Sequence, residues 1–126
     1  FVSEADQFLM SAKQVKGLKV FSMSRNGVSA DDMRKMGDFL RDKDQSVVAL
    51  MASVNEGKIT FLAVCGKEAV AKGVKAGDII KTIAPICGGK GGGKPDSAMG
   101  GGSDLLKLDD ALAALDDFVN EKAKEQ

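Results

Sequence analysis

The spacing of hydrophobic and polar residues predicts the elements of the first half of this chain. Apolar residues three and four positions apart are typical of one face of a helix, and short continuous apolar runs are typical of strands buried on both faces. Phe8, Leu9, Ala12 and Val15 show the first pattern, and residues 46–53 show the second. The predicted elements are the end of a helix (5–15), a strand (18–24), a helix that begins after Ser29, and two strands (46–53 and 58–64).

The order of these elements predicts a mixed sheet. Asn55-Glu56-Gly57 is typical of a tight turn, so the strands on either side of it should form an antiparallel hairpin. A strand, helix and strand in succession need a crossover connection, which makes the first two strands parallel. We therefore expect an α/β (α+β mixed) fold whose mixed β-sheet has about four to five strands and packs with helices.

The second half of the chain adds helices around a glycine-rich segment. A short helix is expected over 67–72, and another begins at Lys75 or Ala76 and ends near Pro85. Glycine then fills eight of the positions between 88 and 102. Ser103 or Asp104 should cap a last helix, whose apolar stripe is Leu105, Leu108, Leu112, Leu115 and Val119. We predict that 1–17 is the end of an upstream helical segment and that 18–126 is a single globular domain with a glycine-rich loop at 88–102.

Composition excludes several classes of function. The 126 residues suit one domain, and no histidine is present, which rules out Ser-His-Asp and Cys-His nucleophiles and His-ligated zinc within this chain. Two cysteines, Cys65 and Cys87, are too few for a disulfide framework and are expected to be small buried side chains. No apolar run has the length of a membrane span, no signal peptide is evident, and the start at Phe1 suggests a fragment of a longer protein.

The formal charge of zero hides a polarised distribution. Residues 58–94 carry seven basic and two acidic side chains, a net charge of +5, whereas residues 95–126 carry three basic and eight acidic ones, a net charge of −5. A basic segment that ends in glycines suits a phosphate, because lysines supply charge and glycines let backbone N–H groups come close. The competing interpretation is that these lysines lie on solvent-exposed helix faces and have no role in binding.

The glycine segment resembles a nucleotide-binding P-loop only in part. Gly88, Gly93 and Lys94 match Gly-x-x-x-x-Gly-Lys, but Pro95 stands where a P-loop has the Ser or Thr that binds magnesium. The segment also follows a predicted helix instead of a strand. A flexible linker is the other alternative, yet a strongly amphipathic helix follows, so we interpret the segment as internal to the fold.

Residues 74–102 carry a resemblance to a known family. Val-Lys-Ala-Gly-Asp-Ile-Ile-Lys-Thr-Ile-Ala-Pro-Ile, followed by Gly-Gly-Lys-Gly-Gly-Gly-Lys-Pro-Asp-Ser-Ala-Met-Gly-Gly-Gly, resembles the C-terminal domain of alanyl-tRNA synthetases. The same domain is found attached to DHH-type phosphoesterases, which usually have a histidine where this chain has Lys94. The resemblance is specific over about residues 60–120, and the lack of histidine favours the synthetase branch.

The resemblance implies a function that composition alone does not. It implies a cytoplasmic domain that binds the elbow of alanine tRNA and supports aminoacylation and editing, with no catalytic residues of its own. It implies no metal or cofactor in this chain, since ATP, Mg and Zn belong to upstream domains, and no membrane. The expected contacts with tRNA phosphates and sugars come from a basic set of lysines and glycines: Lys75, Lys81, Lys90, Gly91, Gly92, Gly93 and Lys94.

Two alternatives remain open at this stage. The domain could be an interaction module that forms a homodimer through the helical segment and the acidic last helix. It could also be the accessory domain of a DHH-type nuclease, in which case short oligonucleotide ends should bind better than folded tRNA. The phenylalanines 21, 39, 61 and 118 are expected in the core, which leaves few platforms for stacking bases.

Overall fold

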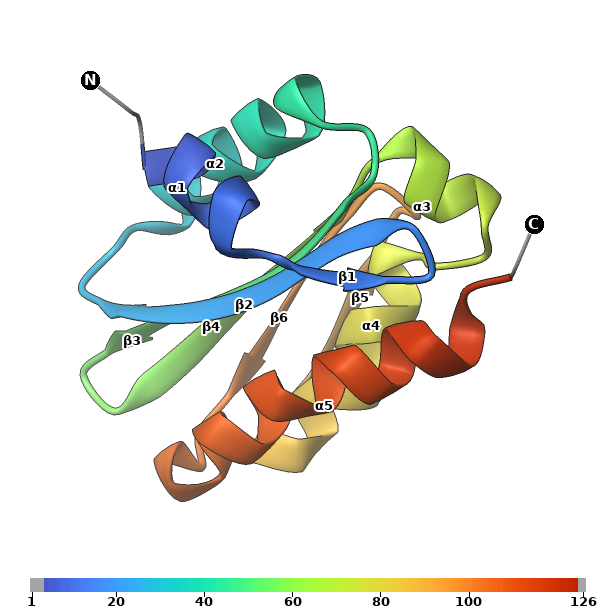
Figure 1. Ribbon diagram of the computed structural model, residues 1–126. Coiled ribbons are helices and arrows are strands. Elements are labelled where there is room, and N and C mark those ends of the chain that lie inside the picture. Colours follow the sequence, from blue (N-terminus) through green and yellow to red (C-terminus); the bar gives the residue numbers. More distant parts are fainter. Residues whose placement is uncertain (1–3, 125–126) are drawn as a thin grey trace.

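A six-stranded mixed sheet forms the centre of the molecule in the computed structural model, which describes residues 4–124 (Figure 1). The strand order is β1-β2-β3-β4-β6-β5, in which β2 and β3 are parallel and all other neighbours are antiparallel. The predicted crossover and hairpin are thus confirmed. The strands are β1 (Lys13–Val15), β2 (Leu18–Asn26), β3 (Val47–Asn55), β4 (Lys58–Cys65), β5 (Lys90–Gly93) and β6 (Ser97–Gly102).

Helices cover both faces of the sheet (Figure 1). On one face lie α1 (Glu4–Ser11) and α2 (Ala30–Lys43), and on the other lie α4 (Ala76–Ile83) and α5 (Leu108–Lys122). The short α3 (Lys67–Ala71) follows β4, and two 3₁₀ turns, η1 (Ala84–Cys87) and η2 (Leu105–Lys107), precede β5 and α5. None of the helices between residues 4 and 124 is long and apolar enough to cross a membrane.

The continuous apolar run of β3 supplies both cores. Val48, Leu50 and Ala52 join the core under α4 and α5. Val47, Ala49 and Met51 join the core under α1 and α2. Successive side chains of a strand point to opposite faces, so a strand between two helical layers must be apolar at every position. This confirms the prediction of a strand buried on both faces.

The first predicted helix ends earlier than its spacing suggested. Residues 5–15 were expected to be helical, but α1 ends at Ser11 and the chain continues as β1, which pairs with β2. Lys16 (φ 50°) and Gly17 (φ 81°) form the turn between them, and two successive left-handed residues are typical of a tight hairpin. Gly17 therefore turns a hairpin and does not terminate a helix. The part of the predicted segment at 1–3 lies outside the described residues.

The last helix also begins later than expected. Asp104 does cap a helical turn, because its carboxylate accepts a hydrogen bond from the Leu106 N–H at 3.1 Å, but this turn is η2. Leu105 was predicted to be on the buried stripe, yet it is 43% exposed because it precedes α5. The remainder of the stripe packs toward the sheet, with Leu115 and Val119 fully buried.

Candidate nucleic-acid interface

The glycine-rich segment is sheet where a loop was expected. β5 is an edge strand that pairs with β6 alone, in a register that places Lys90 opposite Gly101 and Gly93 opposite Ala98. The Pro95-Asp96 corner joins the two strands, and the Lys94 N–H donates to the Ser97 carbonyl at 3.0 Å across it. β6 also pairs with β4, so the second half of the segment lies inside the sheet.

Close packing explains several of the glycines. A Cβ at Gly91 would lie 2.3 Å from the Gly100 Cα and 2.4 Å from the Met99 carbonyl oxygen. A Cβ at Gly77 of α4 would lie 2.8 Å from the Gly93 carbonyl oxygen. Glycine lets two strands and a helix approach to distances that a side chain would prevent. A Cβ at Gly93 would lie 2.7 Å from the Ala98 Cα, so the predicted binding residues Gly91 and Gly93 both have a packing role that the sequence did not reveal.

The start of α4 is tied to the corner that follows β5. The Ala76 N–H donates to the Pro95 carbonyl at 2.7 Å, and the Gly77 N–H donates to the Lys94 carbonyl at 3.2 Å. These amides are among those that a helix leaves without partners at its N-terminus and that a P-loop offers to phosphate. Because carbonyls occupy them here, the resemblance to a P-loop does not extend to this helix start.

Four lysines are brought to one region by this arrangement. Lys75 immediately precedes α4, beside the corner that contains Lys94, and Lys90 begins β5. The Lys81 side chain runs over β5, since a Cβ at Gly92 would meet its Cε at 3.4 Å. We name these four residues, which are all exposed, the α4–β5 lysine surface: Lys75, Lys81, Lys90 and Lys94.

The lysines of the α4–β5 lysine surface form no ion pairs within the described part of the chain. None of its four ammonium groups forms a hydrogen bond or an ion pair with another residue between 4 and 124. Some lysines elsewhere are paired, such as Lys13 with Asp116 at 2.8 Å and Lys19 with Asp44 at 2.6 Å, whereas Lys35 and Lys122 also form no ion pair within residues 4–124. Unpaired lysines attract a polyanion, and releasing its counterions favours binding.

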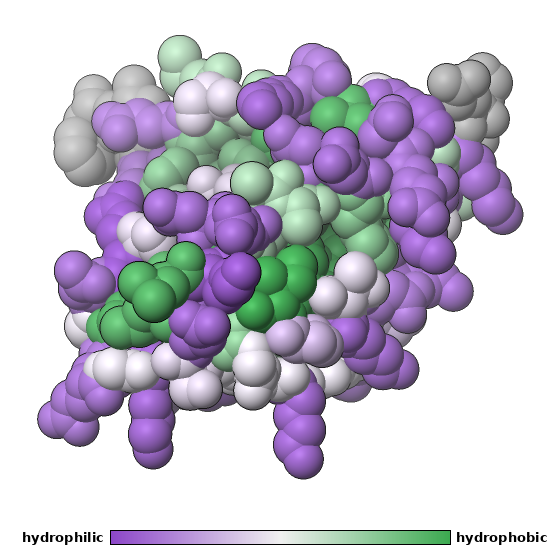
Figure 2. All heavy atoms as spheres, turned by 90° about the horizontal axis from the view of Figure 1, so that it is seen from below, coloured by the Kyte–Doolittle hydropathy of each residue, from purple (hydrophilic) through white to green (hydrophobic). Residues whose placement is uncertain are grey.

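A shallow groove beside Lys90 was not predicted. Its volume is about 400 Å³, and it is lined by residues at the start of β5 and the end of β6 and next to them: Gly88, Gly89, Lys90, Gly101, Gly102 and Ser103. Next to it in the sequence, Leu106 is 94% exposed. Figure 2 shows apolar side chains among charged ones on the side of the molecule that carries η2 and α5. The repeated glycines were the only sequence signal of this groove, and they did not indicate which strands would wall it.

Among residues 4–124, no phenylalanine contributes to the α4–β5 lysine surface. Phe21, Phe61 and Phe118 are core residues, as predicted. Phe39 was also expected in the core but is 44% exposed on α2, where its ring lies 5.4 Å from the Lys43 ammonium. Because α2 covers the opposite face of the sheet from α4, Phe39 offers no stacking platform near the four lysines.

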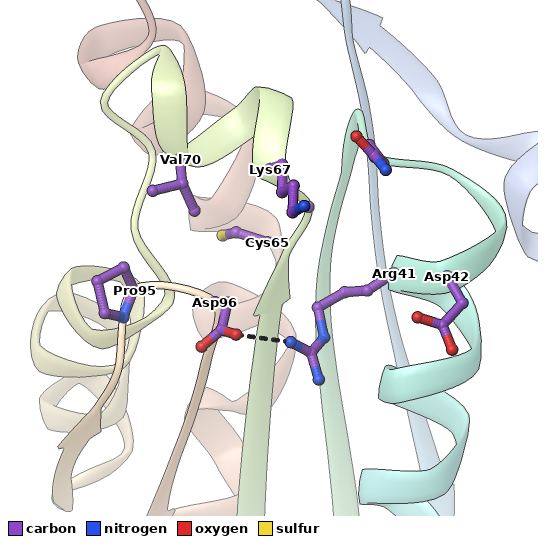
Figure 3. A pocket seen from close by; sticks show the side chains of 9 residues that line it. Arg41, Asp42, Cys65, Lys67, Val70, Pro95 and Asp96 are labelled. Carbon is purple, nitrogen blue, oxygen red and sulfur yellow. Dashed lines mark hydrogen bonds and ion pairs between the residues drawn. The ribbon is translucent and has the colours of Figure 1, made fainter.

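A second cavity, of about 530 Å³, lies between α2, α3 and the corner after β5 (Figure 3). Arg41 reaches from α2 toward Asp96, and their side chains pair at 2.8 Å. Cys65 also lines this cavity, and burial, with the nearby charge of Asp96, raises the pKa of its thiol. Burial also raises the pKa of Cys87. Both cysteines are buried and unbonded, as predicted, and their thiols are poor nucleophiles at neutral pH.

The family model and the relatives that match this chain indicate the same family. The model of the DHHA1 domain matches residues 13–121. The alanine–tRNA ligase of Dehalococcoides mccartyi is 43% identical over 116 residues, which are 92% of this chain and 13% of that protein. The alanine–tRNA ligase of Saccharophagus degradans is 40% identical over 93% of this chain. The chain thus spans about 13% of the length of these relatives.

Solved structures agree with the sequence comparisons. The C-Ala domain of alanyl-tRNA synthetase from Aquifex aeolicus superposes with a TM-score of 0.80 at 28% identity, covering 88% of this chain and 99% of that domain. RecJ of Thermus thermophilus shares the fold with a TM-score of 0.59 at 13% identity, covering 97% of this chain and 18% of RecJ. The chain belongs to the DHHA1 domain family and has the fold of the C-Ala domain of alanyl-tRNA synthetase.

Proposed function

We propose that this domain binds the elbow of alanine tRNA through the α4–β5 lysine surface. The observation that carries the proposal is that α4, the edge strand β5 and the corner after it carry four exposed lysines with no ion pairs to other residues between 4 and 124. Folded RNA is recognised largely through its phosphates, sugars and shape. A protein surface that binds it therefore needs basic side chains and backbone N–H groups more than aromatic side chains. The relatives named alanine–tRNA ligase supply the identity of the RNA.

The domain supports the chemistry of its parent protein and performs none itself. In this proposal the parent is a cytoplasmic alanine–tRNA ligase, and ATP, Mg and Zn act in its other domains. Binding the outer corner of the tRNA would hold the same molecule for both aminoacylation and editing. The residues of the α4–β5 lysine surface bind RNA backbone, and no residue of this chain is assigned a catalytic or metal-binding role.

A binding comparison separates this proposal from the nuclease-type alternative. The 126-residue chain is titrated into fluorescently labelled alanine tRNA and into a short single-stranded RNA, and binding is followed by anisotropy. We expect folded tRNA to bind at least tenfold more tightly, since its rigid shape presents several phosphates at once. Equal or tighter binding of the short RNA would favour an accessory domain for oligonucleotide ends and contradict the proposal.

Sedimentation velocity with the same samples tests the dimerisation alternative. A chain that binds tRNA as a monomer sediments as one species alone and as a one-to-one complex with RNA. A dimer that forms with increasing concentration and does not bind tRNA would instead show that the domain is an interaction module. A dimer that still binds tRNA would retain the proposal and add an assembly to it.

A further inference from the structure

The corner between β5 and β6 is fastened to parts of the molecule that are distant in sequence. The Cys65 N–H at the end of β4 donates to the Asp96 carbonyl at 3.1 Å. The Asp96 carboxylate accepts a hydrogen bond from the Arg41 guanidinium at 2.8 Å. Arg41 belongs to α2, in the helical layer on the other face of the sheet from α4. The corner that contains Lys94 is therefore tied to α2 by one side-chain contact.

Arg41 is itself held in place. Its second terminal nitrogen pairs with Asp38, one turn earlier in α2. Its side chain is only 23% exposed, and its Nε is buried without a hydrogen-bond partner among the described residues. A planar guanidinium held by two carboxylates presents its donors in a fixed direction. Figure 3 shows the Arg41 side chain reaching from α2 to the Asp96 carboxylate.

We propose that Asp96 is a positioning residue, which acts through Lys94 and does not touch RNA. The inference rests on the proposed function. Asp96 lies two residues after Lys94, and the backbone between them is bonded to α4 through the carbonyls of Lys94 and Pro95. The ion pair with Arg41 holds this corner in a single arrangement, so Lys94 is already placed beside Lys75 before RNA arrives. Without the pair, binding must order the corner and becomes weaker.

The sign of the effect distinguishes positioning from simple electrostatics. Asp96 is an acidic residue two positions after Lys94, so removing its charge should strengthen the attraction for RNA if charge alone matters. Positioning predicts the opposite result. Asp42 is the matched control, because it lines the same cavity but has no partner among the described residues and extends away from Asp96 in Figure 3.

The test measures tRNA affinity for Asp96→Asn, Asp42→Asn, Lys94→Ala and the Lys94→Ala/Asp96→Asn double variant. Asp96→Asn should weaken binding about two- to tenfold, the range for ordering one side chain, while Asp42→Asn leaves it unchanged or slightly tighter. In the Lys94→Ala background, Asp96→Asn should have no further effect, because the lysine it positions is absent.

Three results would overturn this inference. First, Asp96→Asn could bind tRNA as tightly as the unsubstituted chain or more tightly. Second, Asp96→Asn could weaken tRNA binding by the same factor in the Lys94→Ala background as in the unsubstituted chain. Third, if Lys94→Ala alone has no effect on tRNA affinity, the proposal that the α4–β5 lysine surface binds tRNA is wrong, and this inference, which rests on it, is wrong as well. Circular dichroism checks folding, and if Asp96→Asn is unfolded, Arg41→Lys replaces it, with the same expected loss and the same dependence on Lys94.

Discussion

Replacing Lys90 and Lys94 together by alanine should weaken binding of alanine tRNA about 25- to 60-fold at about 0.1 M salt. Each lysine that neutralises a phosphate contributes about 0.7 to 0.9 to the slope of log affinity against log salt concentration, which is about five- to eightfold per contact at that salt. The slope itself should therefore fall by about 1.4 to 1.8. Both quantities come from anisotropy titrations between about 50 and 200 mM salt.

A charge-matched variant controls for the loss of two positive charges. Lys35 lies on α2 and Lys122 at the end of α5, and both are exposed and outside the α4–β5 lysine surface. Lys35→Ala/Lys122→Ala removes the same charge and should change the affinity less than threefold. If the two double variants lose affinity equally, binding depends on overall charge and no particular surface is responsible.

Replacing Gly91 by alanine should destabilise the fold by about 3 kcal/mol or more, whereas the same change at Gly92 should alter stability by less than about 1 kcal/mol. The Cβ at Gly91 would meet backbone of β6 at 2.3 and 2.4 Å, and backbone cannot move without breaking the β5–β6 pairing. At Gly92 the nearest atom is the Cε of Lys81 at 3.4 Å, which belongs to a flexible side chain. Chemical denaturation measures both free energies of unfolding.

This pair of neighbours also separates packing from binding in the glycine segment. Gly92→Ala should keep a folded domain, so a change in its tRNA affinity reports on the RNA interface alone. Equal stability losses at Gly91 and Gly92 would contradict the packing described here. A stable Gly91→Ala variant that no longer binds tRNA would show that Gly91 is needed for tRNA binding and not for the packing of β5 against β6.

Local pattern and turn chemistry were sufficient to predict much of this fold. The Ser29 side chain accepts a hydrogen bond from the Asp32 N–H at 3.1 Å, as its position before two aspartates predicted. Glu56 (φ 51°) and Gly57 (φ 78°) form the predicted hairpin turn. These features depend on neighbours in the sequence, and the buried run of β3 depends only on lying between two helical layers.

The features that were wrong or missing depend on partners far along the chain. The spacing of Ala12 and Val15 suits a helix, but Lys13–Val15 is held as a strand by its register with β2, and Lys13 also pairs with the distant Asp116. A contact such as Lys13–Asp116, between residues 103 positions apart, leaves no signal in the local sequence pattern.

The candidate site shows the same division. Lys90 and Lys94 could be selected from the glycine segment and Lys75 and Lys81 from the basic region, but only the fold shows that α4 crosses β5 and brings them together. The role of Gly91 in packing and the pairing of Arg41 with Asp96 could not be foreseen. Both follow from how β6 inserts between β4 and β5, which the order of elements does not specify.

Mapping tRNA contacts on the folded chain by NMR tests the central claim most directly. Backbone amide signals of the ¹⁵N-labelled domain are followed as alanine tRNA is added. The largest changes should fall on β5, on Lys94 and at both ends of α4, with β1 and α1 nearly unaffected. Changes concentrated on α1, α2 or β1, with the signals of residues 75–81 and 90–94 unmoved, would contradict the proposed interface.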